Sequence, residues 1–409
     1  MKKKEKNIII IGGGAAGFFA AAVSAEKNPG NNIIILEKGY TVLGKVKISG
    51  GGRCNVTNSC TDPGELIKYY PRGGKELLSP FHKFNSRDTI NWFERHGVKL
   101  KTEPDGRIFP VSDDSQTIVD CLFDSVQSKG IKVLLQTGVS NIQKSHQQED
   151  WIITTSGKEF QADAVIICSG SSNSVWKIIV SLGHTIELPV PSLFTFNVKD
   201  QRIDGIPGVS VNDAEIKIEG TKLKSSGPLL ITHWGMSGPA ILKLSAWGAR
   251  ELHKSDYKFK LVINWLPGIN QESAKEKLTQ VKNNNLTRRV YSFSPFGLPI
   301  RLWERLLEYT GINKNLKWNN LSGSFLSQLA SQLNQSSFFV NGKSTFKEEF
   351  VTCGGVRRSE IDFQTMESKL HKGLFFAGEV IDIDAITGGF NFQAAWTTGW
   401  IAGISASSV

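Results

Sequence analysis

The chain has 409 residues, 40% of them apolar and 21% charged, which is enough apolar material for a large core divided over two or three domains. No apolar run approaches the roughly 20 residues of a membrane-spanning helix, and the run behind the N-terminal lysines leads into a glycine turn, unlike a signal peptide. The five cysteines form no C-x-x-C pair, which argues against a disulfide framework, a zinc ribbon and a dithiol redox centre. We therefore expect a cytoplasmic protein with reduced cysteines, no metal site and no membrane contact.

The net charge is +10 and the pI is about 9.2, which raises nucleic acid as a partner. The lysines and arginines are dispersed along the sequence, however, and no arginine-rich run with interleaved aromatic residues is present. This pattern is more typical of a solvated surface, so we rank nucleic acid behind a small-molecule substrate. The sequence does not indicate an oligomeric state.

A glycine-rich turn follows the first apolar strand, Ile8 to Ile11. Its three glycines have the G-x-G-x-x-G spacing. The first permits a tight turn, the second lets the backbone approach a pyrophosphate, and the third lets the next helix pack on the strand. Because the N-terminal amides of that helix face the phosphates, the sequence predicts a dinucleotide site. Its residues are Gly12, Gly14, Ala15, Ala16 and Gly17.

The second apolar strand, Ile33 to Leu36, ends in Glu37. A carboxylate at about this interval after the glycine motif accepts hydrogen bonds from a ribose and repels a 2′-phosphate. This position favours FAD or NAD over NADP.

A second glycine cluster, GKVKISGGGRCNVTN, spans Gly44 to Asn58 and opens with a basic segment that we expect to be strand-like. Its three consecutive glycines let the backbone approach a flat or anionic group, and Arg53 can neutralise a phosphate or pair with a carboxylate. Its two asparagines can bridge the loop to a ligand, and Cys54 is a candidate for a reactive thiol beside a flavin. Further along, Glu103 to Ser115 is expected to be a turn-rich loop.

Strands and helices alternate up to about Pro189, which predicts an α/β fold with a mainly parallel sheet. Within this part, Ile131 to Leu135 and Trp151 to Thr155 look like a strand pair beside the strand Ala164 to Cys168. The small residues Ser169 to Ser172 then let the chain turn at the carboxyl edge of the sheet, where ligands of such folds bind.

The composition changes after Leu188, and alternating segments such as Phe194 to Val198 and Lys258 to Ile263 predict an inserted β domain. Within it, His233 and Trp234 are candidates for lining a substrate pocket, although a single histidine is more often structural. A small helical lobe is predicted from Gln271 to about Asn334. Its expected helices are Ala274 to Val281, Ile300 to Tyr309 and Phe325 to Leu333.

The C-terminal part repeats the order of the opening, with a strand at Leu374 to Ala377, an acidic loop, two glycines and a final helix at Phe392 to Ala402. Asp382 in the acidic loop can bind a ribityl or sugar hydroxyl. Amides at the start of the last helix, near Asn391, can stabilise negative charge. No H-E-x-x-H, G-x-S-x-G or P-loop motif is present, so the marks of a metalloprotease, an α/β hydrolase and a P-loop NTPase are missing.

Six segments together resemble a bacterial family of FAD-binding flavoproteins that includes aminoacetone oxidase and bile-acid-type enoyl reductases. They are GGGAAG, GKVKISGGGRCNVTN, DGRIFP, THWGMSGPAILKLS, VTCGGV and FFAGEVIDIDAITGGFNFQAA. The resemblance extends nearly from end to end and implies a Rossmann-like, two-dinucleotide-binding-type FAD domain, split by an inserted β-barrel domain and a small helical lobe. The expected boundaries are 1–190 with 346–409 for the FAD domain, 191–270 with 335–345 for the β domain, and 271–334 for the lobe.

The resemblance also implies positions for FAD. The pyrophosphate would lie at Gly12 to Gly17, the adenosine ribose at Glu37 beside Lys38, and the adenine near the backbone of Val139. Two departures from the family pattern are Ala385-Ile386, where a glycine is more common, and a phenylalanine in place of a common tyrosine at position 390. The remaining implied positions are Lys45, Gly51, Gly52, Arg53, Cys54, Asn55, Gly170, Glu379, Asp382, Gly389, Phe390, Asn391, Phe392 and Gln393.

We therefore expect an FAD-dependent oxidoreductase that transfers a hydride between bound flavin and a small organic substrate, with NAD(P)H as reductant. No second complete glycine motif is visible, so a nicotinamide would visit the flavin pocket. An amine-type oxidase that uses oxygen, a flavin-dependent RNA-modifying or RNA-binding protein, and a redox sensor without turnover are the alternatives. The sequence assigns no catalytic residue.

Overall fold

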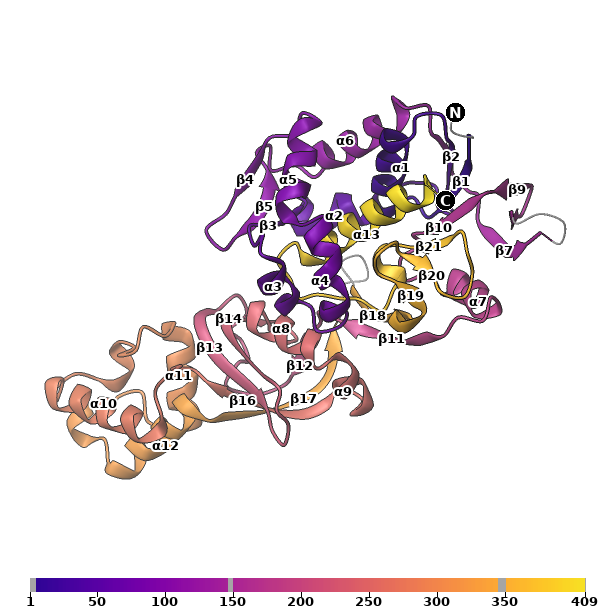
Figure 1. Cartoon of the computed structure of the whole chain (residues 1–409). Coiled ribbons are helices and arrows are strands. Elements are labelled where there is room, and N and C mark those ends of the chain that lie inside the picture. The colour runs from indigo at the N-terminus through magenta and orange to yellow at the C-terminus, as the bar shows by residue number, and fades with distance from the viewer. Residues whose placement is uncertain (1–4, 146–149, 345–350, 409) are drawn as a thin grey trace. The chain divides into compact units, whose positions relative to one another are not determined.

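The computed structural model describes residues 5–145, 150–344 and 351–408, which Figure 1 draws as a coloured ribbon. The chain divides into two compact units. The first unit comprises Met1–Val190 and Lys347–Val409, and the second comprises Pro191–Phe346.

A seven-stranded sheet forms the centre of the first unit. Its strands are β1 (Asn7–Ile11), β2 (Asn32–Leu36), β6 (Lys132–Leu134), β10 (Ala164–Ile167), β19 (Ile361–Asp362), β20 (Glu367–Ser368) and β21 (Leu374–Phe376), in the order β19-β20-β21-β10-β1-β2-β6. The five strands from β21 to β6 are parallel, and β19 and β20 add an antiparallel edge. Because β1 is central, all four of its isoleucines are buried, as in a parallel strand covered on both faces.

The predicted pairing of Ile131 to Leu135 with Trp151 to Thr155 is wrong. The first segment is β6, which pairs in parallel with β2 and follows helix α6 (Gln116–Gln127), the kind of crossover that parallel strands require. The second segment, β8 (Trp151–Thr155), pairs instead with its sequence neighbours β7 (Val139–Lys144) and β9 (Glu159–Ala162) in a separate antiparallel sheet.

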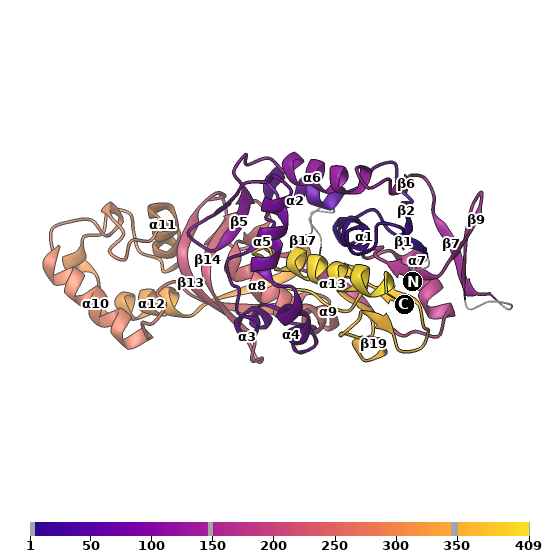
Figure 2. The ribbon, with the colours of Figure 1, turned by 45° about the horizontal axis from the view of Figure 1, so that its top comes forward.

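Helices α1 (Ala15–Lys27) and α13 (Phe390–Ala406) lie side by side in the first unit (Figure 2). Glycines on α13 permit this close contact: a Cβ at Gly399 would lie 2.8 Å from the carbonyl oxygen of Ala16, and one at Gly403 would lie 2.5 Å from that of Ala20. Helix α13 begins two residues before the predicted start, so its first turn reaches back to the glycine pair.

Two further expectations need correction. The basic segment after Gly44 is helix α2 (Gly44–Gly52) and no strand, because alternation over so few residues does not specify a strand. Val46 is the buried residue of this helix, and the left-handed Leu43 precedes it as the N-cap. The stretch from 103 to 115 contains a strand, β5 (Arg107–Pro110), in a small sheet. The other elements of this unit are β3 (Thr57–Asn58), α3 (Pro63–Leu66), α4 (Gly74–Lys83), α5 (Ser86–Arg95), β4 (Leu100–Thr102), α7 (Asn173–Ser181) and β18 (Val351–Val356), the last paired with β11 (Ile186–Ser192).

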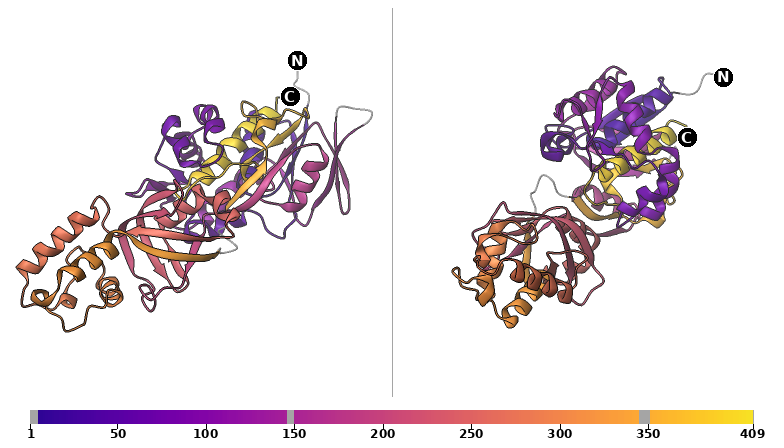
Figure 3. Two further views of the ribbon diagram at one scale, coloured as in Figure 1. Left: turned by 90° about the horizontal axis from the view of Figure 1, so that it is seen from below. Right: turned by 90° about the vertical axis from the view of Figure 1, so that its left-hand side faces the viewer.

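The second unit contains a closed six-stranded barrel (Figure 3). Its strands are β12 (Thr195–Val198), β13 (Ser210–Ile218), β14 (Lys224–Thr232), β15 (Gly235–Ser237), β16 (Lys258–Asn264) and β17 (Ser336–Ser344), in the order β12-β15-β14-β13-β16-β17. Residues along β13 alternate, with Ala214, Ile216 and Ile218 buried in the core. Helices α8 (Pro239–Trp247) and α9 (Ala249–Lys254) follow β15.

A helical lobe joins β16 to β17 in the same unit. Its helices are α10 (Gln271–Asn284), α11 (Ile300–Tyr309) and α12 (Gly323–Asn334). Trp303 and Trp318 are fully buried in its core, and the indole N–H of Trp303 donates to the carbonyl oxygen of Val290 over 3.1 Å. The predicted α/β fold with an inserted β-barrel and a helical lobe is therefore confirmed. Within the described ranges, no helix is both long and apolar enough to cross a membrane.

Candidate cofactor site

The three glycines of the first turn meet three different surroundings. Gly12 has φ +112°, and a Cβ there would lie 2.5 Å from the carbonyl oxygen of Cys168, directly after the neighbouring strand β10. A Cβ at Gly17 would lie 2.0 Å from the carbonyl oxygen of Gly12, so the helix packs directly on the turn. A Cβ at Gly14 would meet nothing within 4 Å. Only Gly14 therefore leaves open space for a ligand to approach the backbone.

Helix α1 starts at this open position without a capping side chain. The N-cap position is Gly14, which has no side chain to accept a hydrogen bond, and no acidic residue lies in the first turn. The first backbone N–H that returns to the turn is that of Phe18, which donates to the carbonyl oxygen of Gly14. The N–H groups of Ala15, Ala16 and Gly17 precede it, at the positive end of the helix dipole. Such a start fits a phosphate group.

Glu37 lies beside the turn at the end of β2. Its Oε2 accepts a hydrogen bond from the N–H of Gly13, and its Oε1 accepts one from the N–H of Gly39, each over 2.7 Å. Each carboxylate oxygen keeps acceptor capacity for a further donor such as a ribose hydroxyl. Lys38 beside it is exposed.

Val139 is held near Glu37 by the chain that connects β6 to β7. The N–H of Thr137 donates to the carbonyl oxygen of Glu37 over 2.8 Å, and the N–H of Gln136 donates to that of Gly39 over 3.0 Å. Val139 follows two residues later and is half-buried. The structure thus brings the predicted ribose and adenine positions to one edge of the sheet.

The second glycine cluster turns through the left-handed region at three consecutive glycines. Gly50, Gly51 and Gly52 have φ values of +59°, +68° and +82°. A Cβ at Gly51 or Gly52 would meet nothing within 4 Å, whereas one at Gly50 would lie 3.0 Å from the N atom of Asn55. Gly51 and Gly52 therefore present open backbone, as Gly14 does.

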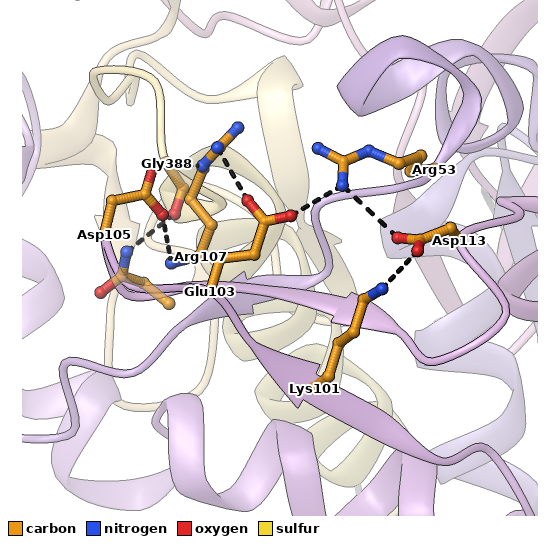
Figure 4. A network of polar contacts seen from close by, with 8 residues as sticks. Arg53, Lys101, Glu103, Asp105, Arg107, Asp113 and Gly388 are labelled. Carbon is orange, nitrogen blue, oxygen red and sulfur yellow. Dashed lines mark hydrogen bonds and ion pairs between the residues drawn. The ribbon is translucent and has the colours of Figure 1, made fainter.

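Arg53 forms ion pairs with carboxylates of the protein, as Figure 4 shows. Its Nη1 lies 2.7 Å from Oε1 of Glu103 and 3.4 Å from Oδ1 of Asp113. Its guanidinium lies over the ring of Phe109. Lys101 also pairs with Asp113. Of the two roles predicted for Arg53, the structure therefore displays the pairing with carboxylates.

Cys54 is fully buried, and burial raises the pKa of its thiol to about 12. A thiol with this pKa carries almost no thiolate near neutral pH, and the thiolate is the nucleophile. The suggested reactive role of Cys54 therefore does not fit its surroundings.

The second glycine cluster is tied to the glycine pair before α13. With its amide oriented for hydrogen bonding, Asn55 accepts from the N–H of Gly389 over 2.8 Å. Asn58 donates to the carbonyl oxygen of Gly388 over 3.1 Å. A Cβ at Gly389 would lie 2.4 Å from the carbonyl oxygen of Thr57. Two motifs more than 300 residues apart in the sequence thus form one structure, and the asparagines bind the protein itself.

Four side chains at the start of α13 also have partners within the protein. Asn391 donates to and accepts from the backbone of Ala385, over 3.0 and 2.9 Å. Phe390 is stacked on Tyr69, with ring centroids 4.2 Å apart. Gln393 is fully buried, and its Oε1 accepts from the hydroxyl of Thr89 over 2.9 Å. Phe392 is half-buried and stacks on Trp396.

At the start of helix α13, the backbone remains available to a ligand. Helix α13 has no side-chain cap and no acidic residue in its first turn. Gln393 is the first residue whose N–H returns to the turn, where it donates to the carbonyl oxygen of Gly389. The start of α13 therefore resembles the start of α1 as a place for negative charge.

Two acidic residues flank the same region in different ways. Glu379 accepts from Lys45 and, over 2.9 Å, from the N–H of Thr352, and its carboxylate lies next to Gly170. Asp382 is 1% exposed and lies 3.8 Å from the guanidinium of Arg358. The geometry thus gathers the remaining predicted positions in the first unit.

Sequence reasoning missed the ion pair between Arg72 and Asp384, both of them buried. It also missed Tyr69, whose ring is half-buried against Phe390. Neither Arg72 nor Tyr69 lies in a motif, and no local signal could have found them. His233 and Trp234 lie in the second unit, on the exposed turn between β14 and β15.

Known proteins resemble the chain over nearly its whole length. It is 28% identical over 399 residues to a 3-dehydro-bile acid delta(4,6)-reductase of Clostridium scindens, covering 94% of this chain and 95% of that protein. It is 29% identical over 384 residues to a ribosomal RNA dihydrouridine synthase of Escherichia coli K12, covering 91% of each. A protein of the same name from Haemophilus influenzae is 28% identical, covering 92% of this chain and 93% of that protein.

Two solved structures share the fold. The 3-ketosteroid-delta4-(5alpha)-dehydrogenase of Rhodococcus jostii RHA1 has a TM-score of 0.53 and 14% identity, covering 100% of this chain and 98% of that one. The 3-ketosteroid delta1-dehydrogenase of Sterolibacterium denitrificans has a TM-score of 0.52 and 10% identity, covering 99% of each chain. The profile of the family described as HI0933-like protein Rossmann domain matches residues 6–405. The chain therefore belongs to this HI0933-like family of FAD-binding oxidoreductases, which agrees with the FAD-binding family that its six segments resemble.

Proposed function

We propose that this protein is an FAD-dependent reductase that adds hydrogen to a carbon–carbon double bond conjugated to a carbonyl group. The names of the relatives support this chemistry. A 3-dehydro-bile acid with double bonds at positions 4 and 6 is a conjugated ketone, and dihydrouridine is uridine whose C5=C6 bond, conjugated to a carbonyl, has been reduced. The two reactions share a reaction type although their substrates differ greatly in size.

One observation carries the proposal for the cofactor: Gly14 borders open space at the uncapped start of α1, with Glu37 at the next strand end. We propose that the amides of residues 15–17 hold the pyrophosphate and that Glu37 accepts from the adenosine ribose. The start of α13 and the open glycines of the second cluster would hold the other end. When bound, FAD supplies hydride transfer, and the chain supplies binding and orientation.

We also propose that the remaining predicted positions contact FAD and that the chain has the three domains expected from its sequence. The FAD domain would comprise 1–190 with 346–409, the inserted β domain 191–270 with 335–345, and the lobe 271–334. Because Asn55, Asn391 and Gln393 bind the protein itself, we assign their side chains a positioning role for the glycine turn at 388–389. Lys45 and Glu379 form a charged pair at the same end.

Two substrate classes fit the proposed chemistry. A small conjugated ketone agrees with the expectation from the sequence, with NAD(P)H as reductant. A uridine of RNA is the second candidate, and one observation favours it. Residues 191–346 contain 20 lysines and arginines against 11 aspartates and glutamates, a net charge of +9, whereas the first unit carries only +1.

The test is anaerobic stopped-flow reduction of the bound flavin by NADH, by NADPH and by candidate amines, followed by mixing with one acceptor at a time. A conjugated steroid ketone, a uridine-containing ribosomal RNA and oxygen are the acceptors. Fast reoxidation by the ketone or by the RNA, with a mass gain of two hydrogens in that acceptor, supports the reductase. Reoxidation by oxygen alone after reduction by an amine supports the oxidase, and a flavin that neither nicotinamide nor amine reduces supports a sensor.

A further inference from the structure

Part of the positive charge of the second unit lies on two adjoining loops of its helical lobe. We call residues 285–290 and 313–318 the basic loop pair. It contains four basic residues, Arg288, Arg289, Lys314 and Lys317, and no acidic residue. All four are exposed. Between Glu308 and Lys347 the sequence has no aspartate or glutamate, and Glu308 itself pairs with one of the four basic residues, Lys314.

Two of these residues face each other directly. Arg289 and Lys317 form an antiparallel bridge, flanked by hydrogen bonds from the N–H of Val290 to Leu316 O and from the N–H of Trp318 to Arg288 O, each 3.0 Å long. This pattern makes them a non-hydrogen-bonded pair, the type in which Cα atoms are about 4.5 Å apart and side chains share one face. Two positive charges are therefore held next to each other by the backbone.

Within the described part of the chain, neither Arg289 nor Lys317 has a carboxylate within ion-pair distance, whereas Lys314 lies 3.3 Å from Glu308. Like charges directly opposite each other destabilise a strand pair. An anion bound between them would remove that repulsion. The arrangement therefore fits a binding site for a negatively charged group better than it fits a structural role.

The neighbouring side chains suit a polyanion with a repeating backbone. Arg288 is held with its guanidinium over the ring of Phe293, 4.3 Å from its centroid, and donates to Asn285 over 3.3 Å. Arginine planes and amide groups are common partners of phosphates and unstacked bases. The amides around the loops belong to Asn283, Asn284, Asn285, Asn313, Asn315, Asn319 and Asn320.

We propose that the basic loop pair binds the phosphate backbone of RNA, with Arg289 and Lys317 as its central contacts. This inference rests on the RNA form of the proposed function. The basic side chains lie on loops between helices, whereas a membrane-binding helix would combine them with an exposed apolar face. Dispersed in sequence, the basic residues do not form a run; they become a cluster because the bridge brings residues 289 and 317 together.

The experiment measures binding of protein-free bacterial ribosomal RNA to the full-length, FAD-loaded protein across a salt series. For the wild type we expect the logarithm of the binding constant to fall linearly with the logarithm of salt concentration. The R289Q/K317Q variant should bind about tenfold or more weakly at low salt, with a salt slope smaller by about two, one for each lost phosphate contact. Conservative substitution, R289K/K317R, should restore most of the binding.

A matched control removes the same charge from the first unit, where Lys27 and Arg87 are exposed. K27Q/R87Q should retain the wild-type salt slope. Equal losses in both double variants would overturn the proposal, because they would indicate a general effect of net charge. The proposal also fails if R289Q/K317Q binds RNA normally but loses binding to phosphatidylserine vesicles or to an acidic peptide.

Reduction of the bound flavin by NAD(P)H separates this inference from the proposed function. R289Q/K317Q should be reduced at the wild-type rate and unfold at the wild-type temperature. If RNA binding depends on the loop pair but no conjugated double bond is reduced, the proposed reaction fails while the RNA surface stands. If the reductase works on a small ketone and no variant alters RNA binding, the surface is refuted and the reductase stands.

Discussion

Glu37 accepts a hydrogen bond from the backbone N–H of Gly13 over 2.7 Å, which joins the end of β2 to the turn between β1 and α1. Its other oxygen accepts from the N–H of Gly39, so both oxygens face donors. The negative charge is thus fixed beside the open backbone of Gly14. This arrangement makes the contribution of Glu37 to cofactor binding measurable by a single substitution.

E37Q should weaken FAD binding about 10- to 100-fold, because the amide turns a donor toward one N–H group and loses a charged hydrogen bond of about 1.5–3 kcal/mol. Fluorescence titration of the flavin-free protein with FAD measures the change. The exposed neighbour provides the control, and K38Q should bind FAD as the wild type does. An unchanged dissociation constant in E37Q would rule out the ribose contact.

Gly14 and Gly17 should respond differently to alanine. At Gly14 a Cβ meets open space and the backbone is extended, so G14A should change the free energy of unfolding by less than about 1 kcal/mol. It should still weaken FAD binding, because the methyl group stands where the pyrophosphate approaches. In G17A the Cβ collides with the carbonyl oxygen of Gly12, which should cost about 1–3 kcal/mol of stability. Denaturation measures the stability of both variants, and titration with FAD measures their affinity. Equal FAD affinity of G14A and the wild type would contradict the pyrophosphate site at Gly14.

The first βαβ unit could be predicted because its signals are local. The isoleucine run, the glycine spacing and the strand-end carboxylate all lie between Ile8 and Glu37. Helices α10 to α12 were predictable for the same reason, since their periodicity lies within each segment. The short segment Lys45 to Ile48 was not, because alternation over so few residues fits a strand and a helix equally. In the helix that forms, Val46 is the buried residue.

The other features that could not be predicted from the sequence depend on tertiary contacts. The glycine loop at residues 50–55 could be singled out as a candidate from its sequence, but the partner of Asn55 is Gly389, near the other end of the chain. Dispersion of charge along the sequence likewise concealed its distribution over the two units, and the pairing of residues 289 and 317 depends on a bridge that no local pattern encodes. Contacts across hundreds of residues require the fold itself.

Alkylation should distinguish Cys54 in the second glycine cluster from Cys60, which follows the cluster. Burial raises the pKa of Cys54 to about 12, whereas Cys60, six residues later, is half-buried. Iodoacetamide on the native protein at pH 8 should therefore modify Cys60 before Cys54, and mass spectrometry of peptides measures the order. Both should react after unfolding. Rapid modification of Cys54 in the native protein would restore its candidacy as a reactive thiol.

The ion pair between Arg72 and Asp384 should be strongly coupled because both residues are buried. D384N leaves the Arg72 charge without its carboxylate and should destabilise the protein by about 3–5 kcal/mol. The R72M/D384L double variant should recover a large part of this loss, because no buried charge remains. Urea denaturation measures both. The exposed pair of Lys68 and Glu65 is the control, and K68Q should cost less than about 1 kcal/mol. Additive losses in the double variant would refute the coupling.

His184 should make stability depend on pH below neutrality. Burial lowers the pKa of His184 from its ordinary 6.5, although Glu360 accepts from its ring over 2.9 Å. The unfolded chain therefore binds a proton that the folded protein does not, and stability falls as pH drops through about 6.5. Burial raises the pKa of Glu360, but hydrogen bonds from Thr185 and His184 outweigh it and lower the pKa overall. The stability from Glu360 is present above pH 4.5 and is lost only below that value, outside this range.

Urea denaturation at pH 7.5 and 5.5 measures the effect, which for one proton cannot exceed about 1.4 kcal/mol per pH unit. H184N should be less stable than the wild type at pH 7.5 but should lose less stability between the two pH values, because an amide does not titrate. H82N, at an exposed position on α4, should retain the wild-type dependence. If H184N and the wild type lose equal stability on acidification, the proton belongs to another group, and burial of His184 does not set the response.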